Sequence, residues 1–216
     1  MHMRIIYSGG YDKYNKESVA NSFFYRYSKI VLQQIEKGKK AVSINFAKPD
    51  RYYNSILEEA FKGKILKIDN INKTKIMWKD YDIIFLPGGS SEWLKNKLIE
   101  TGFSFDKLKK DVVIIGDSAG AYVMSAYFPS YSDIDSLDKE NILDYADKGF
   151  YSESNIFTIT HVNNQKHVPA GALKLAKKLA DKLGVRLLAL KENEEKMLLE
   201  GGTLVSFDIE KLFQYE

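Results

Sequence analysis

One short segment has the residue pattern of a reactive serine. The run Gly116-Asp117-Ser118-Ala119-Gly120 fits Gly-x-Ser-x-Gly, in which the serine lies on a sharp turn between a strand and a helix. Such a turn exposes the serine hydroxyl, and it lets the amide of Ala119, at the helix N-terminus, face a developing oxyanion. We therefore predict that Ser118 is a nucleophile that attacks a carbonyl carbon. The alternative is a turn in which glycine and a capping serine serve geometry alone.

A second glycine-rich turn offers candidates for the other oxyanion contact. The run Leu86-Pro87-Gly88-Gly89-Ser90 lies at the end of an apolar segment, residues 81–86. An oxyanion hole needs a second donor from a neighbouring loop, and the amide of Gly88 or Gly89 could supply it. The alternative is a glycine-rich loop that only begins the following helix.

A serine nucleophile needs a base, and the chain has three histidines. His2 precedes the first predicted strand. His161 directly follows an apolar segment, residues 157–160, and we expect it at the carboxyl end of a sheet strand, on the same edge as Ser118. We predict His161 as the base, and His167, six residues further on, is the alternative.

Apolar strand segments alternate with helical segments along the chain, and these elements must position the site. Strands are predicted at residues 3–7, 40–47, 64–68, 81–86, 111–115, 157–160, 185–190 and 203–207, and helices at 16–37, 53–62, from 90 onward, 120–127 and 170–183. Residues 128–156 are predicted as a long loop with room for a short helix at 139–147. The pattern predicts an α/β fold, a doubly wound, mostly parallel sheet flanked by helices on both faces.

Length and composition limit the class of protein. The 216 residues, 44% hydrophobic and 28% charged, predict a single α/β hydrolytic domain over residues 1–216. The apolar runs are only strand-sized and no signal peptide pattern begins the chain, so we expect a cytoplasmic protein and no membrane partner. The net charge of +3 comes from interspersed basic and acidic residues, so no nucleic-acid partner is expected. The absence of cysteine excludes disulfides, thiolate metal sites and a cysteine nucleophile.

These segments resemble the peptidase E (aspartyl dipeptidase) and cyanophycinase family of serine peptidases, over most of the chain. Residues 81–89 are similar to the family's strand and Gly-Gly-Asn-Thr loop, residues 112–121 to its Ser-Ala-Gly-Ala elbow, and residues 157–161 to its apolar strand running into Pro-His. The resemblance implies a flavodoxin-like sheet related to the class I glutamine amidotransferases. It also implies a catalytic set, with Ser118 as nucleophile, His161 as base, Asp133 as orienting acid, and the amides of Gly89 and Ala119 as oxyanion donors.

The resemblance leads to an expected activity, the hydrolysis of a small peptide through an acyl-enzyme. Asp135 is a second candidate for the acid, because several acids lie in the same segment. Aspartyl specificity requires a cation near the substrate carboxylate, for which Arg51 or lysines are candidates. Asp117 puts a carboxylate beside the nucleophile, which disfavours an anionic substrate group there unless its side chain points away. We expect no metal, no cofactor, and a monomer or small homo-oligomer.

Two other functions fit the same elbow. An α/β-hydrolase esterase shares it, with the order serine, acid, histidine, but its histidine usually lies near the chain end, whereas a long helix and two strands are predicted after His161. A catalytically silent, amidotransferase-like domain would bind a ligand and leave Ser118 unreactive. Glutamine amidotransferase activity itself is not expected, because that chemistry uses a cysteine thiolate.

Overall fold

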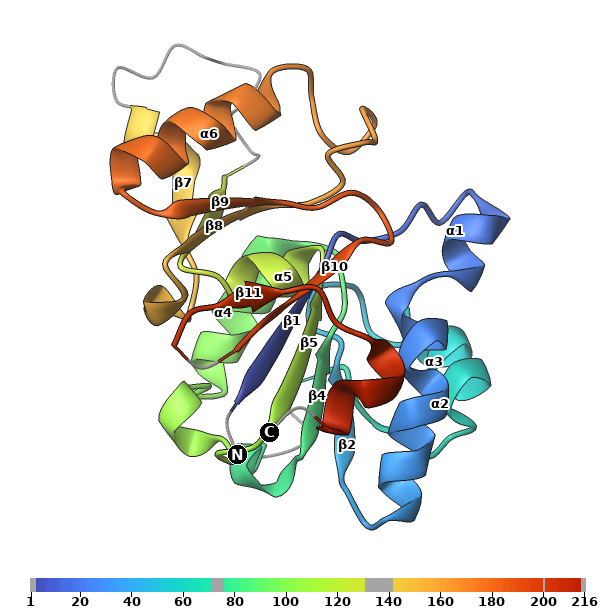
Figure 1. The fold of residues 1–216 in the computed structure, drawn as a ribbon. Coiled ribbons are helices and arrows are strands. Elements are labelled where there is room, and N and C mark those ends of the chain that lie inside the picture. Colours follow the sequence, from blue (N-terminus) through green and yellow to red (C-terminus); the bar gives the residue numbers. More distant parts are fainter. Residues whose placement is uncertain (1–2, 71–75, 131–141, 200, 215–216) are drawn as a thin grey trace.

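Two β-sheets form the framework of the protein (Figure 1). The computed structural model describes residues 3–70, 76–130, 142–199 and 201–214. The larger sheet has the strand order β11 (Leu204–Val205), β10 (Glu195–Leu198), β1 (Arg4–Ser8), β5 (Val113–Asp117), β4 (Ile83–Leu86), β2 (Ala41–Ile44) and β3 (Leu66–Ile68). The smaller sheet has the order β7 (Ala146–Lys148), β6 (Tyr127–Pro129), β8 (Ile156–Ile159) and β9 (Arg186–Ala189).

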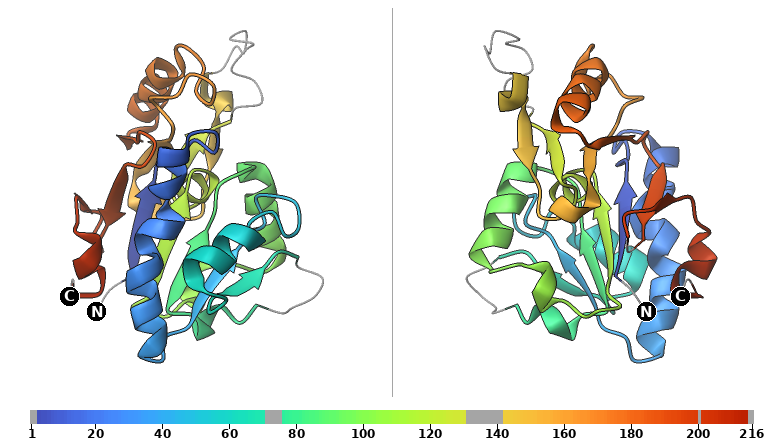
Figure 2. Two further views of the ribbon diagram at one scale, coloured as in Figure 1. Left: turned by 90° about the vertical axis from the view of Figure 1, so that its right-hand side faces the viewer. Right: turned by 60° about the vertical axis from the view of Figure 1, so that its left-hand side comes forward.

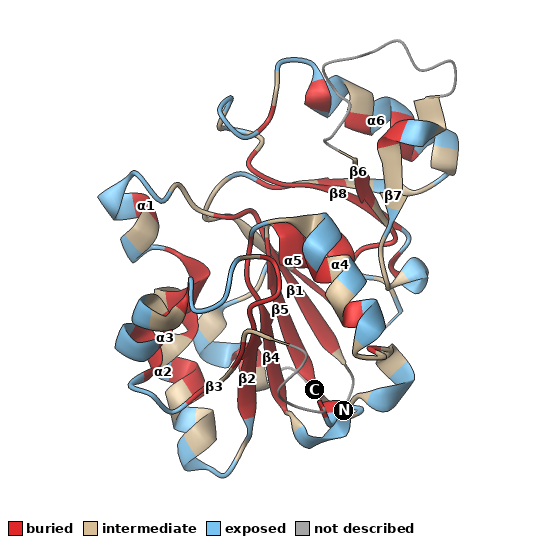
Figure 3. Cartoon of the chain, turned by 180° about the vertical axis from the view of Figure 1, so that it is seen from behind, coloured by how far each residue is buried: buried red, intermediate tan, exposed pale blue. Residues whose placement is uncertain are grey.

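The larger sheet is mostly parallel. Strands β1, β5, β4, β2 and β3 all pair in parallel, whereas β10 and β11 form an antiparallel edge beside β1. Central parallel strands are covered on both faces, so their residues are apolar without alternation, and Figure 3 shows them buried along their length. The carboxyl ends of β1, β4 and β5 therefore meet at one edge, where Ser8, Leu86 and Asp117 lie close together.

Helices cover both faces of the larger sheet. On one face, α2 (Phe23–Glu36) and α3 (Asn54–Phe61) pack against Ile83 and Phe85 of β4. On the other face, α4 (Ser91–Glu100) and α5 (Ala119–Val123) pack against Ile84 and Leu86 of the same strand. The right-hand view of Figure 2 shows α4 and α2 on opposite sides of the sheet. None of the helices within the described residues is long and apolar enough to cross a membrane.

The smaller sheet is covered by α6 (Ala172–Leu183). Its buried residues Ala172, Ala176 and Leu179 recur at helical spacing and pack against Phe157 and Ile159 of β8. Strands β6, β8 and β9 pair in parallel, and β7 pairs antiparallel with β6. After β9 the chain returns to the larger sheet through residues 190–194, which we call the linker.

The predicted α/β fold, with a mostly parallel sheet and helices on both faces, is confirmed, but several local predictions were wrong. The helix predicted at 16–37 is α1 (Lys16–Ala20) followed by α2, because the extended backbone of Ser22 begins a new helix. The helix predicted at 120–127 ends at Val123, and the next residues enter β6. The region predicted as a loop contains β6, β7 and short 3-10 helices at Ile142–Tyr145 and Ser152–Ser154.

The sheet that carries the predicted base also differs from expectation. The strand before His161 is β8, which belongs to the smaller sheet and not to the sheet that carries Ser118. Strand β10 is an addition to the predicted set, since its sequence Glu-Lys-Met-Leu has too short an apolar run to signal a strand. The assignment of one domain over residues 1–216 stays a prediction.

Candidate active site

Ser118 lies on a strained turn between β5 and α5. Its backbone has φ 49° and ψ −104°, a left-handed conformation that residues with a side chain rarely adopt. Two hydrogen bonds hold it there: the Ser118 amide donates to the carbonyl oxygen of Ser8 over 3.0 Å, and its carbonyl accepts from the amide of Tyr122 over 3.0 Å. The first bond ties the turn to β1 and the second begins α5, so strand and helix together fix the hydroxyl at the sheet edge.

The two glycines of the elbow are required by close backbone contacts. A Cβ atom at Gly116 would lie 2.6 Å from the carbonyl carbon and oxygen of Gly120. A Cβ at Gly120 would lie 1.9 Å from the carbonyl oxygen of Leu86. The spacing Gly-x-Ser-x-Gly thus permits α5 to begin directly against β4 and β5.

His161 brings its imidazole to Ser118 from the smaller sheet. Its Nε2 lies 3.0 Å from Ser118 Oγ, a hydrogen-bond distance for a base and its nucleophile. The amide of His161 donates to the carbonyl of Gly9, so its backbone is anchored to the end of β1. Gly10 makes room for the ring, because a Cβ there would lie 2.2 Å from His161 Nε2 and Cε1.

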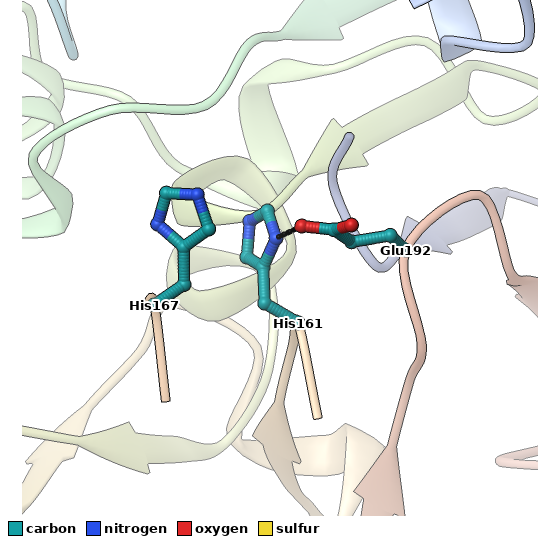
Figure 4. Close-up of side chains that lie close together, drawn as sticks. All are labelled: His161, His167 and Glu192. Carbon is teal, nitrogen blue, oxygen red and sulfur yellow. Dashed lines mark hydrogen bonds and ion pairs between the residues drawn. The ribbon is translucent and has the colours of Figure 1, made fainter. Parts of the chain in front are cut away.

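Glu192, in the linker, is the carboxylate that contacts His161 (Figure 4). Its Oε1 lies 2.9 Å from His161 Nδ1, and both side chains are about nine-tenths buried. A carboxylate only accepts hydrogen bonds when ionised, so Nδ1 carries the proton and Nε2 presents its lone pair to Ser118. Asn164 Nδ2 donates to the same Oε1 over 2.8 Å, which fixes the position of the carboxylate.

The acid predicted from the resemblance cannot be compared with Glu192 directly. Asp133 and its alternative Asp135 lie outside the described residues. Glu192 was missed because the search for an acid was confined to the segment between the serine and the histidine. A signal for it exists: residues 157–160 and 185–190 were both predicted as strands around one helix, so residues just after each strand meet at one edge.

The electrostatics of His161 favour the neutral base. Burial lowers the pKa of its imidazole below the ordinary value, and the nearby ring of His167 lowers it further. The hydrogen bond and charge of Glu192 raise the pKa and oppose this effect in part. His161 is therefore unprotonated near neutral pH and able to accept a proton.

The predicted oxyanion donors lie beside the serine. Tyr53 Oη donates to the Gly88 carbonyl over 2.5 Å, and because the peptide is trans, the amide of Gly89 points away from that contact. Gly89 has φ 139°, and a Cβ there would lie 2.2 Å from the carbonyl oxygen of Ala47. Within the described part of the chain, the amides of Gly89 and Ala119 donate to no other group. Both are available as donors, and their role stays a prediction.

Asp117 directly precedes Ser118 and lines a cavity beside it. Its Oδ1 accepts a hydrogen bond from Ser8 Oγ over 2.7 Å, and the residue is buried. Burial, together with the charges of Glu195 and Glu192, raises the pKa of the Asp117 carboxyl to about 7. Part of the Asp117 carboxyl population is thus uncharged at neutral pH. This reduces the predicted repulsion between Asp117 and an anionic group of a substrate.

A cavity of about 190 Å³ opens over Ser118, and two lysine side chains are among the residues that line it. Lys13 and Lys48 line it together with Tyr11, Tyr52, Tyr53, Gly88, Gly89, Asp117, Ser118, His161 and His167. Burial lowers the pKa of Lys48, and the charge of Lys13 lowers it further, so a bound anion would relieve this repulsion. Of the predicted cation candidates, Arg51 is not among the lining residues, whereas lysines are. A larger hollow of about 970 Å³ lies near Met3 and Ile5, toward the opposite end of β1.

Sequence comparison does not assign this chain to a family. The sequence matches no model of a known protein family. It also has no significant match among curated proteins. The function must therefore be inferred from the serine, the histidine, the glutamate and the surrounding cavity.

Proposed function

We propose that this chain is a serine peptidase of the peptidase E and cyanophycinase type, with the flavodoxin-like fold of class I glutamine amidotransferases. Ser118, His161 and Glu192 would form its catalytic triad and cleave a small peptide through an acyl-enzyme. The observation that carries the proposal is the chain of two contacts, 3.0 Å from Ser118 Oγ to His161 Nε2 and 2.9 Å from His161 Nδ1 to Glu192 Oε1.

The order of these residues along the chain differs from that of an α/β-hydrolase esterase, and it also differs from the serine, acid, histidine order that the peptidase E resemblance implies. In α/β-hydrolases the acid precedes the histidine. Here the carboxylate on the histidine follows it, so the order is serine, histidine, acid. The strained backbone at Ser118 favours chemistry over a silent binding domain, because strain of this kind is usual at reactive serines.

The proposed reaction begins with proton transfer from Ser118 Oγ to His161 Nε2 as the oxygen attacks the scissile carbonyl carbon. The amides of Gly89 and Ala119 stabilise the oxyanion, and Glu192 stabilises the imidazolium. His161 then gives its proton to the leaving amine, and an ester joins Ser118 to the acyl group. Water, deprotonated by His161, attacks this ester and releases the acid product.

Lys13 and Lys48 support a peptide that carries a carboxylate near the scissile bond. Both line the cavity over Ser118, and among the described residues that line it the one acid, Asp117, is partly protonated at neutral pH. A carboxylate bound between two lysines gains charge-assisted hydrogen bonds in a partly buried site. This charge arrangement agrees with the aspartyl specificity that the resemblance implies.

Covalent labelling together with peptide cleavage tests the proposal. A fluorophosphonate should label wild type and not Ser118→Ala, and cleavage by Ser118→Ala should fall about 10⁶-fold, the scale for loss of a triad serine. Peptides that begin with aspartate should be cleaved faster than the matched asparagine peptides.

Each alternative function has its own outcome in these assays. Rapid hydrolysis of a panel of esters with no cleavage of any peptide would identify an esterase. Wild type that is not labelled at all would identify a silent binding domain. Equal cleavage of aspartate and asparagine peptides would refute the role of the lysines but leave the peptidase assignment intact.

A further inference from the structure

A second histidine lies beside the proposed triad and takes no part in it (Figure 4). The rings of His161 and His167 are tilted against each other with centroids 4.6 Å apart. One ligand atom from each of His161, His167 and Glu192 can be chosen so that all three lie within 4.8 Å of one another. The two imidazoles of this cluster line the cavity over Ser118.

The donor set has the chemistry of a zinc site. Two histidine nitrogens and one carboxylate oxygen, with a fourth position for water, form a common arrangement of protein ligands around zinc. Imidazole binds a metal through a ring nitrogen that carries no proton. Glu192 contributes the negative charge that partly neutralises a divalent ion.

Only a small movement closes the cluster around an ion. Zinc lies about 2.0–2.2 Å from nitrogen and oxygen ligands, which places tetrahedral ligand atoms about 3.3–3.5 Å apart. His161 is buried, Glu192 is partly buried, and both are held by hydrogen bonds, whereas His167 is exposed. A rotation of the exposed His167 ring that moves its ligand nitrogen by roughly 1–1.5 Å therefore brings the three atoms close to tetrahedral spacing.

The backbone around His167 already holds it near the triad. Its amide donates to the carbonyl of Asn164 over 3.0 Å, and the Asn164 side chain donates to Glu192. Val168, the next residue, is buried and packs against the smaller sheet. The loop thus positions the histidine while leaving its ring free to turn.

We propose that His161, His167 and Glu192 bind a divalent transition-metal ion of the zinc type, and that this ion reversibly inhibits the hydrolase. A neutral imidazole has one lone pair, on one nitrogen, and a proton on the other. If the ion takes Nε2 of His161, Ser118 loses its acceptor; if it takes Nδ1, Nε2 carries the proton. In both cases His161 no longer accepts the proton of Ser118, and removal of the ion restores the base.

Metal binding is tested on Ser118→Ala, because binding there does not depend on any activity. Titration calorimetry with zinc should give one ion per chain, and cobalt should give the intense visible absorption of a tetrahedral centre. His167→Gln in the same background should weaken binding by at least about tenfold, since even changes to outer-shell partners cost metal sites 10–100-fold. Lys166→Ala, the neighbouring position in the loop, is the matched control and should bind as tightly as its parent.

Inhibition is tested on proteins that retain Ser118, and this arm rests on the proposed function. Zinc should slow fluorophosphonate labelling of wild type, and a chelator should restore the rate. For each protein, the labelling rate with zinc is divided by its labelling rate without zinc. The zinc concentration that halves this ratio should be at least tenfold higher for His167→Gln than for wild type. Equal zinc affinity in the His167→Gln and parent proteins would overturn the site, and binding without inhibition would overturn its regulatory role. Failure of metal-free wild type to label would refute the proposed function, while calorimetry still decides the metal site.

Discussion

The contact between His161 and Glu192 determines which nitrogen of the imidazole faces Ser118. Because the carboxylate accepts the proton on Nδ1, the lone pair of Nε2 is directed at Ser118 Oγ, 3.0 Å away. Asn164 holds the same carboxylate oxygen, so the orientation does not depend on a single bond. The pKa of His161 is then a balance, lowered by burial and raised by Glu192.

Replacing this carboxylate by an amide should reduce both the rate and the pKa of the base. In Glu192→Gln, the imidazolium that forms during the reaction loses its counter-charge, so kcat should fall by about 10²–10⁴-fold. Since Glu192 raises the His161 pKa, its loss lowers that pKa, and the acidic limb of the kcat/KM profile should move to lower pH. The measurement is peptide cleavage as a function of pH.

Glu194→Gln is the matched control for this variant. Glu194 lies in the same linker, and its Oε2 accepts the amide of Lys191, a contact that the Gln side-chain oxygen can keep. Its pH profile should match that of wild type. An unchanged profile and rate in Glu192→Gln would remove Glu192 from the triad and return attention to Asp133 and Asp135.

The residues of the site differed in how far the sequence could predict them. Ser118 and the glycines around it are fixed by contacts within five residues and with the adjoining strand, so the local pattern reveals them. His161 follows a strand that is apolar enough to be recognised. Glu192 is distant in sequence from both, and only the parallel pairing of β8 with β9 brings it to the histidine.

At the scale of elements, the turn between β5 and α5 holds Ser118 in a conformation that favours glycine. The left-handed backbone of a residue with a side chain costs about 1–3 kcal/mol, which the hydrogen bonds to Ser8 and Tyr122 must offset. The function of the elbow therefore reduces the stability of the strand-to-helix connection.

Two inactive variants measure that strain. Ser118→Gly and Ser118→Ala both lose the hydroxyl, but only glycine relaxes at φ 49°, so the glycine variant should be more stable by about 1–3 kcal/mol in urea unfolding. Asn96, exposed within α4, is the control position. There the alanine variant should be more stable to unfolding than the glycine variant by about 0.5–1 kcal/mol. Greater stability of Ser118→Ala over Ser118→Gly would show that the turn is not strained.

Strands with long apolar runs were predicted well, whereas strands that form only by pairing with other strands were predicted poorly. β1, β4 and β5 are buried on both faces, and their continuous apolar sequences identify them. β6 and β7 have three residues each and exist because they pair with each other and because β6 also pairs with β8. Such strands depend on tertiary contacts that no local pattern contains.

At the scale of the whole molecule, the site is assembled from both sheets. Ser118 belongs to the larger sheet, His161 follows β8 of the smaller one, and Glu192 lies in the linker between them. Gly9 is the point where they meet: its amide donates to the Glu194 carbonyl and its carbonyl accepts from His161. A Cβ at Gly9 would lie 1.8 Å from the carbonyl oxygen of Lys191.

Gly9→Ala should therefore reduce activity without touching a triad residue. The added methyl group displaces the linker and shifts Glu192 from His161, and a displacement of about 1 Å can cost about 100-fold in rate. Gly184→Ala is the control for a glycine replacement without a clash: Gly184 has φ 67°, which disfavours alanine, but no atom lies within 4 Å of its added Cβ. Peptide cleavage and circular dichroism should show a loss of rate with retained secondary structure in Gly9→Ala, and a rate equal to wild type would contradict this role of the linker.

The position of the linker also sets the moment at which reactivity arises during synthesis. The ribosome completes the nucleophile and then the base, but the glutamate emerges only after the helix α6 and the strand β9 have been made. In the proposed hydrolase, His161 of an unfinished chain therefore lacks the counter-charge of Glu192. The proposed catalytic set is complete only after the linker has joined the two sheets.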